Sequence, residues 1–338
     1  MTLAKISAVS AAPSYELPDS AIAQSPVEPR DAARLLVDRG PRSEPAHHLV
    51  RDLPTLLREG DLLVVNESKV LPARLRLQKA TGGAVEVLLL EDEGDGVWTA
   101  LVRPGRRLPP GTVLDAGDLV VHVGERLDGG ARRVRLEADD LDAALTAHGE
   151  VPLPPYITTP LADPSRYQTV YATEPGSVAA PTAGLHLTDA VLDGLRARGV
   201  AMARVDLHVG LDTFRPVTAE RLEDHEIHAE RYAIPPETIE AVERASRVVA
   251  VGTTTVRALE SWAATGERAG RTRLLIHGDY RWQVVDALIT NFHLPRSTLL
   301  LLVESFIGPR WRDLYATALT EGYRFLSFGD AMLLERRR

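Results

Sequence analysis

The chain of 338 residues contains no cysteine, which excludes disulfide bonds, thiolate metal sites and cysteine nucleophiles. This composition fits a reducing compartment. Long apolar runs are also missing, because the longest candidate, residues 299–303, ends at Glu304 and a membrane span needs about 18 residues. The first 12 residues lack the continuous apolar segment of a secretory signal. We therefore expect a cytoplasmic protein without a membrane partner.

Positive charge is scarce: 39 Lys and Arg stand against 47 Asp and Glu, a net charge of −8. This balance argues against a broadly basic nucleic-acid surface. Two arginine clusters remain, at residues 103, 106 and 107 and at residues 132, 133 and 135. Each is either a solvated strand face or a phosphate contact. The glycine pattern of dinucleotide sites, the phosphate-loop lysine and the Gly-x-Ser-x-Gly nucleophile turn are all absent.

Residues 70 to about 150 have the pattern of a small β module. Short strand candidates at 85–90, 98–102, 119–123 and 132–136 are separated by Gly, Pro and Asp turns. This spacing predicts a small all-β barrel, and the proline-rich residues 151–156 predict a rigid return linker.

The rest of the chain has a different pattern. It predicts a helix at 30–37, a buried strand at 61–65 and, after residue 186, alternating strands and helices. These segments are 189–199, 204–208, 237–245, 248–251, 254–264, 274–277, 285–290, 297–306, 311–322 and 324–328. Alternation predicts an α/β domain with a largely parallel sheet, open or closed as a barrel. We expect a discontinuous, barrel-like α/β domain, residues 1–69 and 156–338, with residues 70–155 inserted as the β-barrel.

The loop from Gly176 to Thr188 combines small residues, Pro181 and His186 just before a predicted helix. Glycine and alanine allow a close approach of backbone and ligand, and Thr188 is suited to cap the helix start. The segment is either a tight loop with an incidental histidine or part of a site. Six of the ten histidines follow this point, most of them at strand ends, where α/β folds place active sites. They are His186, His208, His225, His228, His277 and His293.

The segment with His225, His228 and Glu230 raises the question of a metal site. Zinc-binding helices use His-Glu-x-x-His, and the spacing here is one residue short. Acid–base or hydrogen-bonding chemistry is favoured over metal binding, and no metal is expected.

Two further segments carry polar groups suited to a ligand. Thr253, Thr254 and Arg257 follow a strand and a glycine, so they either bind an anion at a helix start or simply cap it. The segment Arg166-Tyr-Gln-Thr-Val-Tyr171 either stacks and hydrogen-bonds a base or anchors the linker.

Motifs along nearly the whole chain resemble the S-adenosylmethionine:tRNA ribosyltransferase-isomerase family of queuosine biosynthesis. They include Gly60-Asp-Leu-Leu-Val-Val-Asn66, Leu71-Pro-Ala-Arg-Leu75, Ser177-Val-Ala-Ala-Pro-Thr-Ala-Gly-Leu-His186, Leu207-His-Val-Gly-Leu211, Thr213-Phe-Arg-Pro-Val217 and Asp286-Ala-Leu-Ile-Thr-Asn-Phe-His-Leu-Pro295.

The resemblance implies transfer and isomerisation of the ribosyl group of S-adenosylmethionine onto a 7-aminomethyl-7-deazaguanine base in tRNA. Epoxyqueuosine-tRNA forms, and adenine and methionine leave. The implied partners are tRNA and S-adenosylmethionine, no cofactor is implied, and we expect a monomer. Our hypothesis for the catalytic residues is His186, His208, His225, His228 and Glu230. The substrate-binding candidates are Arg166, Tyr167, Gln168, Tyr171, Thr182, Arg215, Thr253, Thr254, Arg257, Asn291 and His293.

Some motif positions depart from the family pattern. Asn66-Glu-Ser-Lys69 stands where Asn-Asp-Thr-Arg is usual, and Asp212 replaces a glycine in a loop expected to approach the ligand. A carboxylate there is a reason to keep a second hypothesis, in which a paralogous S-adenosylmethionine-processing enzyme acts on a small-molecule acceptor.

Overall fold

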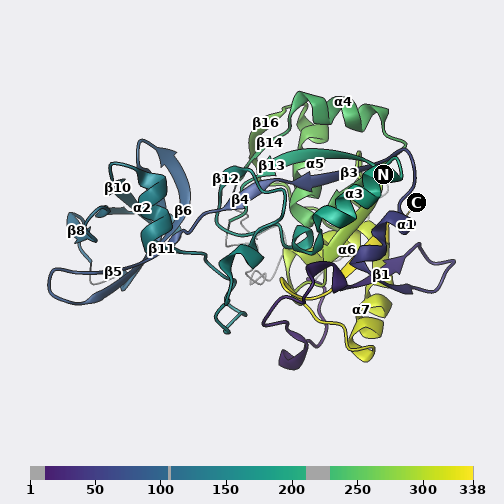
Figure 1. The fold of residues 1–338 in the computed structure, drawn as a ribbon, viewed down its shortest axis with the longest axis horizontal. Helices are drawn as coiled ribbons and strands as arrows, with labels where there is room; N and C mark the ends of the chain where they lie inside the picture. The colour runs from purple at the N-terminus through teal and green to yellow at the C-terminus, as the bar shows by residue number, and fades with distance from the viewer. Residues whose placement is uncertain (1–11, 106–107, 211–228, 338) are drawn as a thin grey trace, which may run out of the picture.

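The computed structural model describes residues 12–105, 108–210 and 229–337, which form two β-sheet bodies (Figure 1). The larger body is built on a sheet of nine strands. Across the sheet these are β16 (Ala269–Thr272), β14 (Glu230–Ala233), β13 (Ala201–Leu207), β3 (Asp61–Asn66), β15 (Arg247–Val251), β17 (Ala287–Asn291), β18 (Ala331–Glu335), β1 (Arg34–Asp38) and β2 (Ala46–Leu49).

The nine-stranded sheet is mixed. The central strands β13, β3, β15 and β17 are parallel, but β18 pairs with β17 antiparallel, and β14 does so with β13. The expectation of a largely parallel sheet thus holds for the centre only. Within the described residues β16 and β2 end the strand order without pairing with each other, so this sheet is open.

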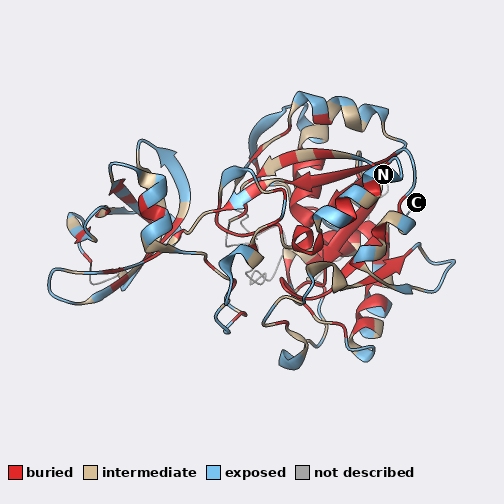
Figure 2. Ribbon diagram, viewed as in Figure 1, coloured by how far each residue is buried: buried red, intermediate tan, exposed pale blue. Residues whose placement is uncertain are grey.

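Helices cover both faces of this sheet and make a three-layer body (Figure 2). Successive residues of one strand, such as Leu62 and Leu63, point to opposite faces of the sheet and enter two different apolar cores. α1 (Leu53–Leu56) and α3 (Asp189–Ala197) cover one face, and α5 (Thr253–Thr265), α6 (Thr298–Ile307) and α7 (Trp311–Thr320) contribute to the core on the other, with α4 (Pro236–Arg244) at its side. Thr188 caps α3 as predicted, because its hydroxyl accepts the N–H of Val191 at 3.3 Å.

The smaller body is an antiparallel sheet of seven strands from residues between Arg74 and Glu150. In spatial order these are β11 (Gly149–Glu150), β5 (Arg74–Gln78), β6 (Ala84–Gly94), β7 (Val97–Arg103), β10 (Arg132–Glu137), β9 (Val120–Arg126) and β8 (Thr112–Asp115). β10 alternates strictly between buried and exposed residues, as a half-buried strand must. The sheet curls until Cα atoms of β5 and β8 lie within 8 Å of each other, and α2 (Leu141–His148) packs into its core.

Several contacts tie the bodies together, and Val178 of the larger body is part of the apolar core of the smaller one. β4 (Ser68–Val70) pairs in parallel with β12 (Glu174–Ser177) where the chain passes between them. Arg271 of β16 forms an ion pair with Glu91 of β6. The proline-rich residues 151–156 run between the two bodies without regular structure, as predicted for a linker.

Three predicted elements were wrong. Residues 30–37 form a 3-10 turn and strand β1 instead of a helix, because the neighbouring β18 and β2 supply backbone partners on both sides. Residues 274–277 and 324–328 are not strands; the strands lie at β16 and β18 instead, and Phe325 makes only an isolated bridge with Ile22.

The arginine cluster at 132, 133 and 135 is a strand face with one inward member. Arg132 is 2% exposed and donates to the carbonyls of Gly105 and Leu108, so it is not a phosphate contact. Arg133 is exposed and pairs with Glu93 and Glu125. Arg106 and Arg107 lie outside the described residues. No helix in the described part of the chain is long and apolar enough to cross a membrane.

Candidate active site

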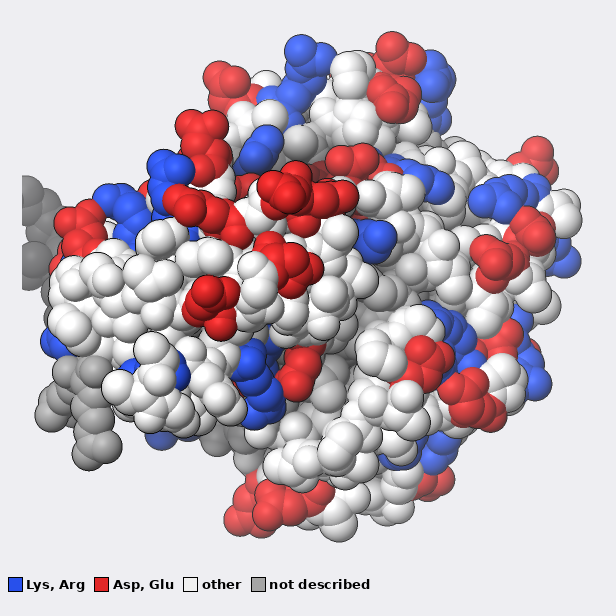
Figure 3. Space-filling model, turned by 60° about the vertical axis from the view of Figure 1, so that its left-hand side comes forward, with Lys and Arg blue, Asp and Glu red and all other residues white. Residues whose placement is uncertain are grey.

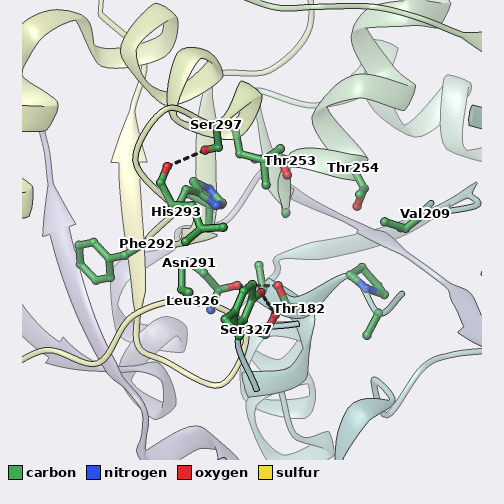
Figure 4. A pocket seen from close by; sticks show the side chains of 18 residues that line it. Thr182, Val209, Thr253, Thr254, Asn291, Phe292, His293, Ser297, Leu326 and Ser327 are labelled. Carbon is green, nitrogen blue, oxygen red and sulfur yellow. Dashed lines mark hydrogen bonds between the residues drawn. The ribbon is translucent and has the colours of Figure 1, made fainter. Parts of the chain in front are cut away.

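A cavity lies at the carboxyl ends of the central parallel strands, the edge where α/β sheets bind ligands (Figure 4). Val209 follows β13, Gly252 follows β15, and Asn291 ends β17. The cavity encloses about 590 Å³ up to and including its mouth. Its lining consists of Tyr156, Ala180, Pro181, Thr182, Ala183, Val209, Gly252, Thr253, Thr254, Thr290, Asn291, Phe292, His293, Leu294, Ser297, Leu299, Leu326 and Ser327.

The threonines at the start of α5 reach the cavity because of Gly252. This glycine has φ +88, a value that lets the chain turn from β15 directly into the helix. Thr253 and Thr254 are each 6% exposed and line the cavity. The Thr254 hydroxyl accepts a hydrogen bond from Asn66 at the end of β3, over 3.3 Å.

Asn291 joins the cavity wall to His186. Its Oδ1 accepts from the Thr182 hydroxyl at 3.0 Å, and its Nδ2 lies 3.1 Å from Nε2 of His186 and 3.4 Å from the carbonyl of Asp330. Since Nδ2 is the donor, Nε2 of His186 is an acceptor, and the neutral ring carries its proton on Nδ1. Burial, with the charges of three nearby arginines, lowers the pKa of His186 to about 4.

His293 faces the cavity and is held on several sides. Its Nε2 lies 2.9 Å from the Thr290 hydroxyl, and its backbone N–H donates to the Tyr315 hydroxyl at 3.0 Å. Its carbonyl accepts from the Tyr15 hydroxyl. Burial lowers the pKa of His293 to about 3, so its ring is neutral at pH 7.

His208 lies next to the cavity-lining Val209 but does not line the cavity itself. Its Nε2 is 3.0 Å from Oδ2 of Asp206. A Cβ on Gly176 would come within 2.3 Å of Cε1 of His208, so the ring occupies the space that only glycine leaves open. The His186 loop and the end of β13 are therefore packed against each other at this glycine.

Glu230 and Arg257 form a buried ion pair between β14 and α5. The Arg257 Nε also donates to the carbonyl of Leu274 at 3.2 Å. Its Nη2 is buried and has no hydrogen-bond partner in the part of the chain that the structure describes. Burial lowers the pKa of Arg257 to about 10. Neither side chain lines the cavity.

The tyrosines predicted to stack a base are in the protein interior, which corrects that prediction. Tyr167 is fully buried edge-on against Phe328, and Tyr171 is 5% exposed within the core under α3. Gln168 hydrogen-bonds both backbone groups of Val70, so this segment anchors the linker to β4, the alternative that the sequence left open. Arg166 is 11% exposed and pairs with Glu28 beside a second hollow.

Three predicted site residues, Arg215, His225 and His228, lie outside the described residues, as does Asp212. Among the described residues there is no group of three or more His, Asp or Glu side chains placed to hold a metal ion. The structure thus gathers Thr182, Thr253, Thr254, Asn291 and His293 around one cavity, with His186 directly behind Asn291.

Sequence reasoning missed several cavity residues. Leu326 and Ser327 line the cavity at a bend where Leu326 adopts φ +69. A leucine rarely adopts this conformation, so the sequence does not predict the bend. Asn66 belongs to one of the family motifs but was not among the predicted site residues. Its amide bridges β3, β13 and α5. Its place at the end of a buried strand was the signal that could have identified it.

The comparisons with known proteins agree on one family. A family model described as "Queuosine biosynthesis protein" matches residues 11–334. An S-adenosylmethionine:tRNA ribosyltransferase-isomerase of Rubrobacter xylanophilus is 56% identical over 326 residues, covering 95% of this chain and 96% of the relative. The chain belongs to the queuosine biosynthesis protein family. The resemblance predicted from the motifs is confirmed.

Two further members of the queuosine biosynthesis family extend the match. The protein of the same name from Thermus thermophilus is 54% identical over 340 residues, covering 95% of this chain and 97% of the relative. The crystal structure of S-adenosylmethionine tRNA ribosyltransferase from Thermotoga maritima matches with a TM-score of 0.55 and 38% identity. That match covers 95% of this chain and 98% of the other, so the fold is shared across both bodies.

Proposed function

We propose that the protein is an S-adenosylmethionine-dependent tRNA ribosyltransferase-isomerase. It moves the ribosyl group of S-adenosylmethionine onto the aminomethyl nitrogen of a 7-deazaguanine base in tRNA, forms epoxyqueuosine-tRNA, and releases adenine and methionine. The observation that carries the proposal is a cavity at the carboxyl ends of three parallel strands, β13, β15 and β17, in a chain more than 50% identical to relatives of that name. A cytoplasmic location and a monomeric state are part of this proposal.

The cavity suits a nucleoside with a sulfonium side chain. Small-molecule sites combine apolar walls with a few polar groups that orient the ligand. Here Val209, Leu299 and Leu326 supply apolar wall, while Thr182, Thr253 and other hydroxyls supply hydrogen bonds. The neutral ring of His293 adds a polar group without adding positive charge that would repel a sulfonium.

The reaction requires three proton movements, and these set the tasks of the histidines. The sulfonium acidifies the adjacent C5′ proton for removal by a base, adenine needs a proton as it leaves, and the attacking amine must be neutral. His208, oriented by Asp206, is our candidate for proton transfer, because a base held by a carboxylate is the arrangement that activates such steps. His186 acts through Asn291 as a positioning residue. His225, His228 and Glu230 are further candidates for proton transfer.

Arg257 is the candidate for the methionine carboxylate. Its guanidinium is buried, anchored on Glu230 and Leu274, and retains one Nη2 without a partner among the described residues. Thr254 lies one turn earlier on the same helix and lines the cavity. A methionine carboxylate that reached this nitrogen would form a charge-assisted hydrogen bond with it.

The two bodies divide the work in this proposal. Residues 1–69 and 156–338 form the catalytic domain, because the cavity is built from them alone. Residues 70–155 form an inserted β-barrel domain that contacts tRNA. Figure 3 shows acidic and basic side chains interspersed on one face, without a continuous basic surface there, so tRNA binding has to rest on local contacts.

The test is a turnover assay with S-adenosylmethionine and two tRNAs that differ only in the aminomethyl base. We expect adenine release and a heavier nucleoside with the modified tRNA, and neither product with the unmodified control. His208→Gln should reduce adenine release by at least tenfold, whereas His48→Gln, on the edge strand β2, should leave it unchanged. Adenine release that needs no tRNA would favour the second hypothesis, a small-molecule acceptor, which the departure at Asp212 keeps open.

A further inference from the structure

A second, smaller and partly open hollow lies beside the main cavity and shares Ser327 with it. Its lining consists of Pro26, Val27, Arg30, Arg166, Leu185, His186, Ser327 and Phe328. His186 therefore has two faces: Nε2 is bonded to Asn291 of the main cavity, and the ring borders this hollow.

Three arginines lie close to His186, and two of them, Arg30 and Arg166, line the hollow. After burial, the charges of Arg324, Arg30 and Arg166 are the causes that lower the pKa of His186. The pKa of Arg30 is itself lowered, first by burial and then by the charge of Arg166. Two guanidinium groups are thus held near each other although they repel, an arrangement that an anion between them would stabilise.

The arginines are held mainly by neutral carbonyl groups. Arg30 Nη1 donates to the carbonyls of Gln168 at 2.9 Å and Leu185 at 3.4 Å. Arg324 donates to the carbonyls of Ser25 at 3.1 Å and Phe328 at 2.9 Å. These bonds fix the guanidinium groups without neutralising them.

Carboxylates offset only part of this charge. Arg166 donates to the carbonyl of Val27 at 2.8 Å and pairs with Glu28, whose side chain is 69% exposed. Asp163 and Asp189 act on the charge of Arg30 at longer range.

His186 adds a neutral donor to the same hollow. Because Asn291 donates to Nε2, the ring proton sits on Nδ1, and no described residue hydrogen-bonds to that atom. The hollow is therefore lined by two guanidinium groups and by the ring that carries this N–H, which are donor groups suited to the oxygen atoms of one anion. The Ser327 hydroxyl at its edge is 2.7 Å from the Tyr156 hydroxyl.

We propose that this hollow binds a backbone phosphate of the tRNA next to the nucleotide that is modified. The inference rests on the proposed function for its ligand. A guanidinium fork matches two oxygens of a phosphodiester. Asn291 and Ser327 stand between the hollow and the main cavity, so the carboxylate of an S-adenosylmethionine bound in that cavity is not the expected occupant. A phosphate here would leave the neighbouring base free to enter the main cavity.

The experiment measures binding of an anticodon stem-loop RNA as a function of salt concentration. For Arg166→Gln we expect a dissociation constant about tenfold larger. The slope of log affinity against log salt should be smaller in magnitude by about 1. The matched control is Arg244→Gln, which removes an exposed arginine of α4 and should change neither quantity. Arg166→Lys should retain most of the salt slope but bind less tightly, because a lysine has fewer N–H groups to share among Val27, Glu28 and the phosphate.

A second arm locates the phosphate and separates the outcomes. In a series of stem-loops, each carries one uncharged methylphosphonate at a different position. One position in this series should weaken binding to the wild-type protein. The same replacement should not weaken binding to Arg166→Gln. Equal sensitivity of both proteins at every position would overturn the proposal. So would a raised KM for S-adenosylmethionine with unchanged RNA binding, which would assign the hollow to the carboxylate instead. Adenine release is measured separately, so its absence in wild type would remove the proposed function without deciding the binding result.

Discussion

The side-chain amide of Asn291 donates to Nε2 of His186 over 3.1 Å and so determines which nitrogen of that ring carries the proton. The amide cannot turn round, because its oxygen accepts from Thr182 and its nitrogen also faces the carbonyl of Asp330. One residue thus sets the polarity of a buried imidazole between two hollows. The Asn291 amide, in the wall of the main cavity, donates an N–H to the ring of His186. The ring, which borders the smaller hollow, keeps its own N–H at Nδ1.

Replacing this amide by a carboxylate should reverse the preference of the ring. In Asn291→Asp the new side chain only accepts, so Nε2 of His186 must be protonated to bond it, and the added negative charge favours the imidazolium. We expect the pKa of His186 to rise from about 4 by at least two units. NMR titration of the ring resonances measures it, with Asn291→Ala as the uncharged control in which the pKa stays low.

Stability should depend on pH through the two buried histidines. The pKa values of His186 and His293 are lowered in the folded protein to about 4 and about 3, against 6.5 for the free side chain. The unfolded chain therefore binds protons first as the pH falls below 6.5, and stability declines from there down to the folded pKa. Each histidine contributes up to about 1.4 kcal/mol of lost stability per pH unit in that window.

Urea unfolding at pH 7, 6 and 5 measures this decline. His293→Gln should flatten the dependence between pH 6 and 5, because its ring contribution is removed. The exposed His277→Gln is the matched control and should keep the wild-type dependence. An unchanged slope in His293→Gln would mean that this ring is solvated in the folded protein.

Gly176 should tolerate no side chain while His208 is present. In Gly176→Ala the new Cβ would lie 2.3 Å from Cε1 of His208, and the ring would have to leave Asp206. We expect a loss of about 1–3 kcal/mol in the free energy of unfolding, the usual cost of overpacking, together with a large loss of adenine release. Gly105→Ala, where a Cβ would meet nothing within 4 Å, should be neutral.

A double variant separates the clash from the backbone cost at Gly176, where φ is +140. Gly176→Ala with His208→Ala removes the obstructing ring, so the two stability losses should sum to more than the loss of the double variant. If the losses are additive, the glycine is needed only for its backbone conformation.

The sequence predicted those parts of the fold that depend on local pattern. The buried run at Asp61–Asn66 and the cap at Thr188 were both recognisable, because burial of a strand and capping of a helix need only neighbouring residues. Strand β1 was taken for a helix because its state is decided by β18, about 300 residues away in the chain. Tertiary pairing outweighed the local spacing there.

The candidate site shows the same division. Thr253, Asn291 and His293 follow strand ends, and the shared edge of a parallel sheet brings them together as expected. The sequence did not indicate that Tyr167 and Tyr171 are buried, because tyrosine occurs both in protein cores and on binding surfaces. The proximity of Arg30 and Arg166 could not be predicted from the sequence, because it depends on how the N-terminal segment folds over the His186 loop.

Neighbouring threonines at the start of α5 should behave in opposite ways. Thr253 lines the cavity, whereas the Thr255 hydroxyl donates to the carbonyl of Val251 at 2.7 Å inside the core. Thr253→Val should raise the KM for S-adenosylmethionine about fivefold, the equivalent of one lost hydrogen bond of about 1 kcal/mol, and leave the free energy of unfolding nearly unchanged. Thr255→Val should lower that free energy by about 1 kcal/mol and leave KM unchanged. Steady-state kinetics and urea unfolding of both variants measure the contrast, and a raised KM in Thr255→Val alone would place the ligand elsewhere.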